Sequence, residues 1–267
     1  MSEQARPYRA TTISEATQVA SHGAPQEAGQ TGAAGIPKDA RQMVSFSFFA
    51  VDPAWRRLPA AEKRKQGEEL AGVLKSLSKR CMILTYSLVG LKAGADLLIW
   101  RVGQRIEDLQ AISRAVRQTA LAGYLTMTHS YLSMTKRSTY VDTLDPDHQD
   151  RRRFITPANS AYLFVYPFVK TREWYHLPFD QRQVMMDEHI RVGNKYPSVR
   201  LHTTYSFGMD DQEFVVAFET DTPQDFLDLV QELRETKGSV YTLRDTPIFT
   251  CVRKPPLEIF QDLGMTV

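Results

Sequence analysis

The chain has 267 residues, of which 42% are apolar and 24% charged, and its 33 Lys and Arg against 31 Asp and Glu leave a net charge of +2. These values suit one large or two small folded domains and exclude a strongly basic, nucleic-acid-binding chain. Two cysteines are too few for a disulfide framework, and the longest apolar runs fall far short of the roughly 20 residues that cross a bilayer. We therefore expect a cytoplasmic protein that binds neither nucleic acid nor membrane.

The N-terminal segment differs in composition from the rest. Residues 1–40 are rich in Ala, Gly, Ser, Thr and Gln and contain no Phe, Trp or Leu that could anchor a core. The segment has no apolar region of a secretory signal, and Glu3, Glu15 and Glu27 argue against a transit peptide. We predict a disordered extension over 1–42.

The remainder of the chain is repeated at a distance of 119 residues. The matching features are Trp55-x-x-Leu58-Pro59 with Trp174-x-x-Leu177-Pro178, Thr85-Tyr86-Ser87 with Thr204-Tyr205-Ser206 and, after one inserted residue, Gly90 with Gly208 and Leu97–Trp100 with Val215–Phe218. Because Trp is rare and the spacing is kept, we infer two copies of one module. The copies span 43–140 and 160–255, with a charged linker over 141–159 and a C-terminal tail over 256–267.

The hydrophobic pattern predicts the same element order in both copies. In the first we expect strand Val44–Val51, a helix after Pro59, a strand ending at Gly90, strand Ala95–Val102, helix Ile106–Gln118 and strand Tyr124–Met134. In the second we expect strand Ala161–Lys170, helix Asp180–Val192, a strand ending at Gly208, strand Glu213–Glu219, helix Pro223–Thr236 and strand Ser239–Val252. This β-α-β-β-α-β order is that of a ferredoxin-like module. The predicted fold class is α+β, with tandem ferredoxin-like modules forming a dimeric α+β barrel.

The two copies differ at positions that could carry chemistry. Under the repeat, the second copy has Tyr166, Lys170 and His189 where the first has Ser47, Val51 and Leu70. The difference suggests that function was retained in the second copy, and neutral drift explains three positions equally well.

His189 is the most informative histidine. On the expected helix it shares the core-facing stripe with Met185 and Gly193. A single inward histidine is what the proximal side of a haem iron requires, although such a residue is more often a hydrogen-bonded core histidine. No histidine forms an HxH or HExxH pattern, so a zinc site is not supported.

The first strand of the second copy offers a wall for a flat ligand. Alternation places Tyr162, Phe164, Tyr166, Phe168 and Lys170 on one face. A row of aromatic rings that ends in a lysine suits an anionic, aromatic ligand such as a porphyrin with propionates. The alternative is an ordinary half-buried strand whose lysine reaches solvent.

Four motifs together resemble the chlorite dismutase-like superfamily of haem proteins. They are Tyr166-Pro-Phe-Val-Lys170, Glu173-Trp-Tyr-His-Leu-Pro178, Met185-Met-Asp-Glu-His189 and Gly208-Met-Asp-Asp-Gln-Glu-Phe214. The resemblance covers about 43–255 and implies a homo-oligomeric ring, usually a pentamer, with one haem-type ligand in the C-terminal module. The superfamily contains chlorite dismutases, which use haem b and a distal arginine, and coproheme decarboxylases. The latter use hydrogen peroxide to convert two propionates of iron coproporphyrin III into vinyl groups, which gives haem b.

The resemblance implies a role for each matching residue. His189 matches the proximal iron ligand, and Tyr166 matches a reactive tyrosine that becomes a radical and abstracts hydrogen from a propionate. Lys170 matches a lysine that pairs with the second propionate. Leu201 stands at the distal position, where chlorite dismutases have an arginine, and leucine supplies no charge to hold chlorite.

Three further ligand contacts are implied by the same resemblance. Phe168 packs on the macrocycle, Trp174 lies near the propionates or is structural like Trp55, and Arg153 contacts a propionate or lies on a solvated face. Lys237 departs from the family, which usually has an acidic residue there that hydrogen-bonds the proximal imidazole.

We expect a coproheme decarboxylase-like, haem-dependent oxidoreductase. The alternatives are a chlorite dismutase or weak haem peroxidase, and a non-catalytic haem-binding ring protein.

Overall fold

A computed structural model describes residues 31–32, 36–37, 40–140 and 154–266. The chain divides into two compact units, Met1–Ala40 and Arg41–Val267. In the first unit the described residues form an antiparallel pair of short strands, β1 (Thr31–Gly32) and β2 (Ile36–Pro37). Most of the predicted extension, and most of the predicted linker, lie outside the described residues.

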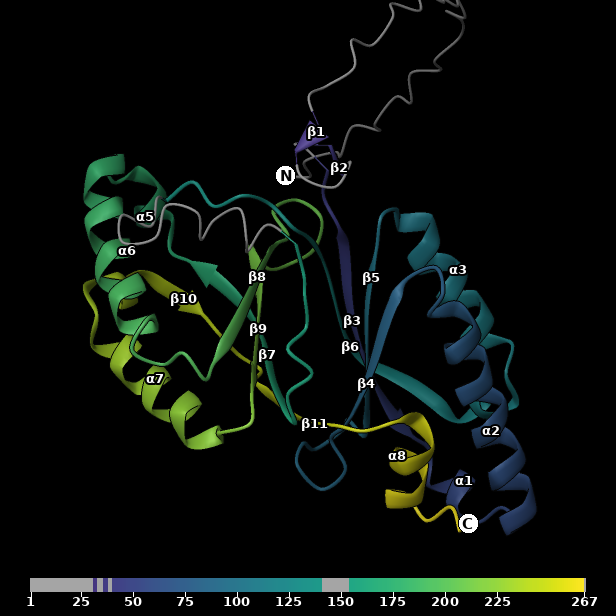
Figure 1. Ribbon diagram of the computed structural model, residues 1–267. Coiled ribbons are helices and arrows are strands. Elements are labelled where there is room, and N and C mark those ends of the chain that lie inside the picture. Colours follow the sequence, from purple (N-terminus) through teal and green to yellow (C-terminus); the bar gives the residue numbers. More distant parts are fainter. Residues whose placement is uncertain (1–30, 33–35, 38–39, 141–153, 267) are drawn as a thin grey trace, which may run out of the picture. The chain divides into compact units, whose positions relative to one another are not determined.

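The second unit consists of two halves that follow the predicted order up to the second long helix of each half (Figure 1). The first half contains β3 (Met43–Val51), α1 (Pro53–Arg56), α2 (Ala60–Leu77), β4 (Met82–Ser87), β5 (Leu97–Gly103), α3 (Ile106–Arg117), η1 (Ala120–Tyr124) and β6 (Leu125–Met134). The second contains β7 (Tyr162–Lys170), α5 (Arg172–His176), α6 (Phe179–Gly193), β8 (Arg200–Tyr205), β9 (Phe214–Thr220), α7 (Pro223–Glu235), η2 (Lys237–Tyr241), β10 (Thr242–Arg244), β11 (Phe249–Arg253) and α8 (Pro256–Asp262). None of the helices in the described parts of the chain has the length and apolar character needed to cross a membrane.

The strands of this unit close into a barrel. They form an antiparallel sheet in the order β10-β7-β11-β4-β5-β3-β6-β8-β9, and β9 also pairs with β7, which closes the sheet. Alternate side chains from both halves fill the interior, among them Phe48, Trp100, Val165 and Phe249, all fully buried. The rings of Phe48 and Phe249 stack with their centroids 3.9 Å apart. The predicted α+β barrel fold is confirmed.

Helices cover the outer faces of both halves of the barrel (Figure 1). The outer cluster of the first half lies under α2 and α3 and includes Trp55, Leu70 and Ile112. The outer cluster of the second half lies under α6 and α7 and includes Tyr166 and Phe226. Because side chains of a strand alternate, each strand contributes one set of residues to the barrel interior and the other to these outer layers.

The 119-residue offset matches Phe46 of β3 with Val165 of β7, and both side chains lie in the barrel interior. Trp100 pairs with Phe46, and Ala217 pairs with Val165, so Trp100 corresponds to Ala217, and the predicted match of Leu97–Trp100 with Val215–Phe218 is wrong by one residue. Phe46 and Val165 are 119 residues apart, as the repeat predicts.

The same pairing corrects the repeat at β4 and β8. Leu84 and His202, which are 118 residues apart, pair with Trp100 and Ala217 respectively. The predicted match of Thr85 with Thr204 is therefore wrong by one residue, and the first half has one extra residue before β4 and another between β4 and β5. A shift of one residue exchanges the two faces of a strand. The Thr204 hydroxyl accordingly contacts Ser133 inside the barrel, whereas that of Thr85 donates to the Lys254 carbonyl.

The predicted last strand, Ser239–Val252, is divided in the structure. Its start belongs to η2, and β10 and β11 are separated by residues 245–248. Pro247 lies in this gap, and proline has no N–H to donate to a sheet. β11 pairs with β7 of its own half and with β4 of the other half, so the division lets one segment join the two halves.

The predicted C-terminal tail contains a helix, α8, which packs on the first half. Phe260 is fully buried, with its ring 5.9 Å from that of Trp55. A Cβ atom at Gly67 of α2 would lie 3.1 Å from the Phe260 ring, so glycine permits this close approach.

We expect Phe260→Ala to lower the free energy of unfolding by about 3–5 kcal/mol, because it leaves a cavity between α8 and α2. Urea denaturation monitored by circular dichroism measures this change. The matched control is Glu258→Ala on the exposed side of α8, with an expected change within about 0.5 kcal/mol. Equal effects of the two substitutions would show that α8 is not part of the core.

Candidate functional site

The predicted aromatic row of β7 lies on the outer face of the barrel, toward α6 and α7. Tyr166 and Phe168 belong to one hydrophobic cluster with Leu201 of β8 and Val192 of α6. Tyr166 is 7% exposed, and its ring stacks on that of Phe218 with centroids 5.8 Å apart. The structure therefore brings three of the predicted site residues, Tyr166, Phe168 and Leu201, together on one surface.

Tyr166 is held as a neutral phenol. Burial raises its pKa well above the ordinary value; the Asp245 carboxylate raises it further, and the Arg234 guanidinium opposes this. Arg234 and Asp245 form an ion pair with each other. The Tyr166 hydroxyl thus keeps its hydrogen throughout the neutral pH range, which is the state that a hydrogen-atom donor requires.

Lys170 ends the aromatic row with a half-buried ammonium group. Its Nζ donates a hydrogen bond of 2.7 Å to the Gly238 carbonyl and lies 4.5 Å from the Trp174 ring centroid and 5.3 Å from that of Phe168. Burial lowers the pKa of Lys170 to about 8, against the opposing attraction of Glu213. The ammonium is therefore poised between its charged and neutral forms a little above neutral pH.

Glu213 holds the Lys170 end of β7 in place through hydrogen bonds. No pattern in the sequence pointed to this role. Its carboxylate, on a residue 8% exposed, accepts hydrogen bonds from the Lys170 backbone N–H at 2.8 Å and the Tyr175 hydroxyl at 2.6 Å. Arg172 lies 3.6 Å away as an ion-pair partner. Glu213 belongs to the motif that ends at Phe214, and only the fold shows that it reaches β7.

The Trp174 ring, which contacts the Lys170 ammonium group, is buried. Its ring is 2% exposed and lies 5.6 Å from that of Tyr241. Trp55, its counterpart in the first half, is fully buried and donates a hydrogen bond from Nε1 to Gln66. The shared burial agrees with a structural role for this tryptophan in both halves.

His189 lies on the inward side of α6. Met185, one turn earlier, is 3.8 Å from the Cβ position of Gly238, and Val192, one turn later, packs in the cluster with Tyr166. At 3.6 residues per turn, His189 lies between Met185 and Val192 along the helix and within about 60° of both around its axis, so it shares their inward side.

The inward face of α6 is suited to a flat ligand. No residue of α6 is buried, and Met185, Met186, His189 and Ile190 are all half-buried. Its counterpart α2 instead buries Leu70, the residue equivalent to His189. An imidazole on an apolar, half-covered helix face opposite an aromatic wall fits an iron tetrapyrrole, whose iron takes a nitrogen ligand and whose macrocycle takes apolar contacts.

Although position 237 is a lysine and not the acidic residue usual in the family, a carboxylate lies close to it where α6 meets η2. The Lys237 backbone N–H donates a 2.9 Å hydrogen bond to Oε2 of Glu188, the residue that precedes His189. The Lys237 side chain and Glu235 are exposed. Arg153, the remaining predicted ligand contact, lies outside the described residues.

Comparison with known proteins places the chain in a family. The chlorite dismutase family matches residues 63–254, which is most of the chain. The chain belongs to this family. Chlorite dismutase family proteins that resemble it include a coproheme decarboxylase from Mycolicibacterium smegmatis, 31% identical over 77% of this chain and 87% of that protein. A coproheme decarboxylase from Staphylococcus carnosus is 29% identical over 70% of this chain and 81% of that protein.

Solved structures of the family share the fold. Chlorite dismutase from Candidatus Nitrospira defluvii in complex with imidazole has a TM-score of 0.75 and 26% identity, covering 82% of this chain and 94% of that one. A heme-binding protein from Thermus thermophilus has a TM-score of 0.74 and 25% identity, covering 84% of this chain and 95% of that one. The resemblance inferred from the four motifs is thus confirmed at the level of the family.

Proposed function

We propose that this chlorite dismutase family protein is a coproheme decarboxylase. It converts two propionates of iron coproporphyrin III into vinyl groups with hydrogen peroxide as oxidant, and the product is haem b. The observation that carries the proposal is the placement of Tyr166 and Lys170 on one face of β7, under the helix that bears His189. Similarity to coproheme decarboxylases over most of the chain supports it.

The residues of the site divide the work of binding. His189 would hold the iron, and Phe168 and Leu201 would contact the macrocycle. Lys170, over Trp174, would pair with one propionate, with Arg153 as a second cation for this purpose. When bound, the iron tetrapyrrole supplies the redox chemistry with peroxide. The predicted homo-oligomeric ring, a pentamer, remains an expectation from the family.

Tyr166 performs the bond-breaking step in this proposal. Its phenol gives up the hydrogen atom of Oη, and the oxygen radical then takes a hydrogen atom from the propionate carbon next to the ring. The same propionate loses a further electron and its carboxylate as carbon dioxide. For each vinyl group formed, one hydrogen peroxide and one proton are consumed and two waters are produced. Ser47, the equivalent residue of the first half, cannot do this because an aliphatic hydroxyl does not form a stabilised radical.

Leu201 argues against chlorite as the substrate. It is half-buried in the cluster with Phe218, with which it pairs across β8 and β9. An aliphatic side chain offers no hydrogen bond or charge to an oxyanion at the iron. The chlorite dismutase and weak peroxidase alternatives are therefore treated as outcomes of the test, together with a haem-binding protein that lacks activity.

The test is to load the protein with iron coproporphyrin III, add hydrogen peroxide in steps and follow the porphyrin mass. We expect two successive losses of carbon dioxide plus two hydrogens, ending at haem b. A parallel sample receives chlorite, and dioxygen release is measured. Dioxygen release without loss of porphyrin mass would assign the protein to chlorite chemistry. Binding without either reaction would assign it to weak peroxidase activity or to haem binding alone.

The lowered pKa of Lys170 predicts a pH-dependent affinity for coproheme. As pH rises through about 8 the ammonium of the ligand-free protein loses its charge. The affinity for coproheme, whose propionate pairs with this ammonium, should therefore fall about tenfold from pH 7 to pH 9. Lys170→Arg should remove this dependence while keeping affinity, and Lys170→Gln should bind weakly at both pH values. Spectroscopic titration measures all three.

The matched control is Lys195→Gln, which removes an exposed lysine paired with Glu232. Its affinity should follow that of the wild type across the pH range. A pH dependence that survives in Lys170→Arg would assign the titration to another group.

A further inference from the structure

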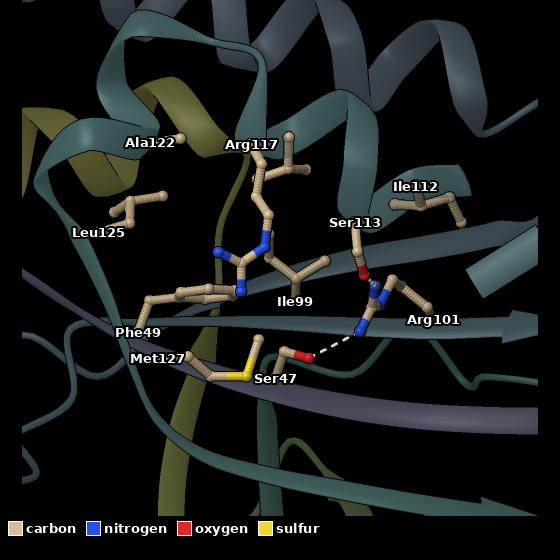
Figure 2. A pocket seen from close by; sticks show the side chains of 11 residues that line it. Ser47, Phe49, Ile99, Arg101, Ile112, Ser113, Arg117, Ala122, Leu125 and Met127 are labelled. Atoms are coloured by element: carbon tan, nitrogen blue, oxygen red, sulfur yellow. Dashed lines mark hydrogen bonds between the residues drawn. The ribbon is translucent and has the colours of Figure 1, made fainter. Parts of the chain in front are cut away.

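The first half of the barrel contains a cavity in the place that aromatic residues fill in the second half. The cavity has a volume of about 90 Å³ and lies between the outer face of the sheet and α3 (Figure 2). Ser45 pairs with Arg101 across β3 and β5, and at the equivalent place Phe164 pairs with Phe218. Ser47, which lines the cavity, is equivalent to Tyr166. Small side chains in the first half thus leave the space that rings occupy in the second.

Arg101 brings a buried positive charge to this cavity. The residue is 7% exposed, and its guanidinium donates to the hydroxyls of Ser45 and Ser47 at 2.8 and 2.7 Å and to that of Ser113 at 2.5 Å. It also donates to the Leu109 carbonyl at 3.2 Å, and its Nε has no partner among the described residues. Burial lowers the pKa of Arg101 to about 10, and the nearby Cys81 thiol opposes this shift. Within the described part of the chain, all the hydrogen-bond partners of this charge are neutral hydroxyl or carbonyl groups.

The side chains of Arg101 and its serine partners offer more hydrogen-bond donors than acceptors. The Ser113 hydroxyl donates to Leu109, but those of Ser45 and Ser47 accept from Arg101 and make no further hydrogen bond within the described part of the chain. A buried arginine that is not compensated by an acid is costly, and natural structures pair such charges. An acceptor with a negative charge would complete this group.

A second guanidinium and apolar walls complete the cavity. Figure 2 shows Arg117 extending from α3 toward Ile99 and Phe49, on the same side of the sheet as Arg101. Arg117 is exposed and forms no ion pair among the described residues. Apart from Ser113, the rest of the lining consists of apolar side chains, including Met127. The cavity therefore offers cationic groups beside an apolar wall.

We propose that this cavity is a binding site for a small organic carboxylate. The carboxylate accepts hydrogen bonds from Ser47 and from Arg117 and compensates the charge of Arg101. Its short hydrocarbon chain lies against Ile99, Phe49 and Met127. This proposal does not depend on the function of the second half, and it assigns a ligand to the half that the sequence analysis predicted to have none.

The test uses the full chain labelled with ¹³C in its methionine methyl groups. Sodium butyrate is added at constant ionic strength, and the Met127 resonance, assigned with Met127→Leu, reports the cavity. Parallel titrations use phosphate and chloride. Arg117→Gln and Ser47→Ala are compared with Arg114→Gln, which removes an exposed arginine of α3 that does not line the cavity. Arg101 itself is left intact because its four hydrogen bonds support the fold.

We expect butyrate to shift the Met127 resonance in a saturable manner. The affinity for butyrate should be about tenfold lower in Arg117→Gln and in Ser47→Ala, and unchanged in Arg114→Gln. Absence of a saturable shift would overturn the proposal, as would equal binding by Arg117→Gln and the wild type. Equal shifts with phosphate or chloride would overturn the assignment to a carboxylate with an apolar chain.

Discussion

Replacement of Tyr166 by phenylalanine should reduce decarboxylation by roughly 10³-fold or more, because it removes the only group assigned to take hydrogen from the propionate. The substitution deletes one oxygen and keeps the ring, so the stack on Phe218 and the packing of the cluster remain. Affinity for coproheme should change by less than about threefold. Stopped-flow measurement of porphyrin conversion, with binding measured separately, gives both values.

Tyr162→Phe is the matched control for this experiment. Tyr162 lies on the same face of β7 as Tyr166 and is also associated with the outer cluster. It should retain the activity of the wild type. Full turnover by Tyr166→Phe, or an equal loss in both variants, would show that the chemistry does not pass through Tyr166.

Replacement of His189 by alanine should weaken coproheme binding by about a hundredfold, which corresponds to about 2.7 kcal/mol. The iron would lose its protein ligand, and the absorption spectrum of the complex should change with it. His189 is half-buried, so its removal should leave the fold intact, and circular dichroism checks this.

The control for His189 is His176→Ala on α5, an exposed histidine thirteen residues earlier. We expect the affinity and spectrum of the wild type for this variant. An unchanged spectrum in His189→Ala would make His189 an ordinary core histidine, which is the alternative that the sequence left open.

Much of the fold could be predicted because the duplication repeats hydrophobic periodicity along with rare residues. Trp55 and Trp174 mark equivalent turns, and both are buried in the structure. That Thr203, and not Thr204, is the counterpart of Thr85 could not be detected, because the identical triplet Thr-Tyr-Ser matches in the wrong register and only Thr85 and Thr203 are identical in the right one. Only the pairing of β4 with β5 and of β8 with β9 decides it.

The parts that could not be predicted depend on contacts between distant segments. α8 is short, and it is specified by its packing near Gly67, about two hundred residues earlier. Glu213 reaches β7 only because β9 lies beside it. Arg101 carried no signal in the sequence, because its burial and its serine partners appear only when β3, β5 and α3 come together.

His189, Tyr166 and Lys170 were found by a comparison that needs no contacts, namely the difference between two copies of one module. Their neighbourhood, with Tyr166 and Val192 in one cluster and Lys170 against Trp174, follows from the fold. The first copy shows what the same scaffold does with Leu70 in place of His189, since that position is then completely buried.

The most direct measurement is the structure of the chain in complex with iron coproporphyrin III. We predict iron bonded to Nε2 of His189, one propionate beside the Tyr166 hydroxyl and another within hydrogen-bond distance of Lys170 Nζ, all in the second half of the barrel. Iron held by a different residue, or a tetrapyrrole that leaves Tyr166 without a propionate neighbour, would contradict this prediction.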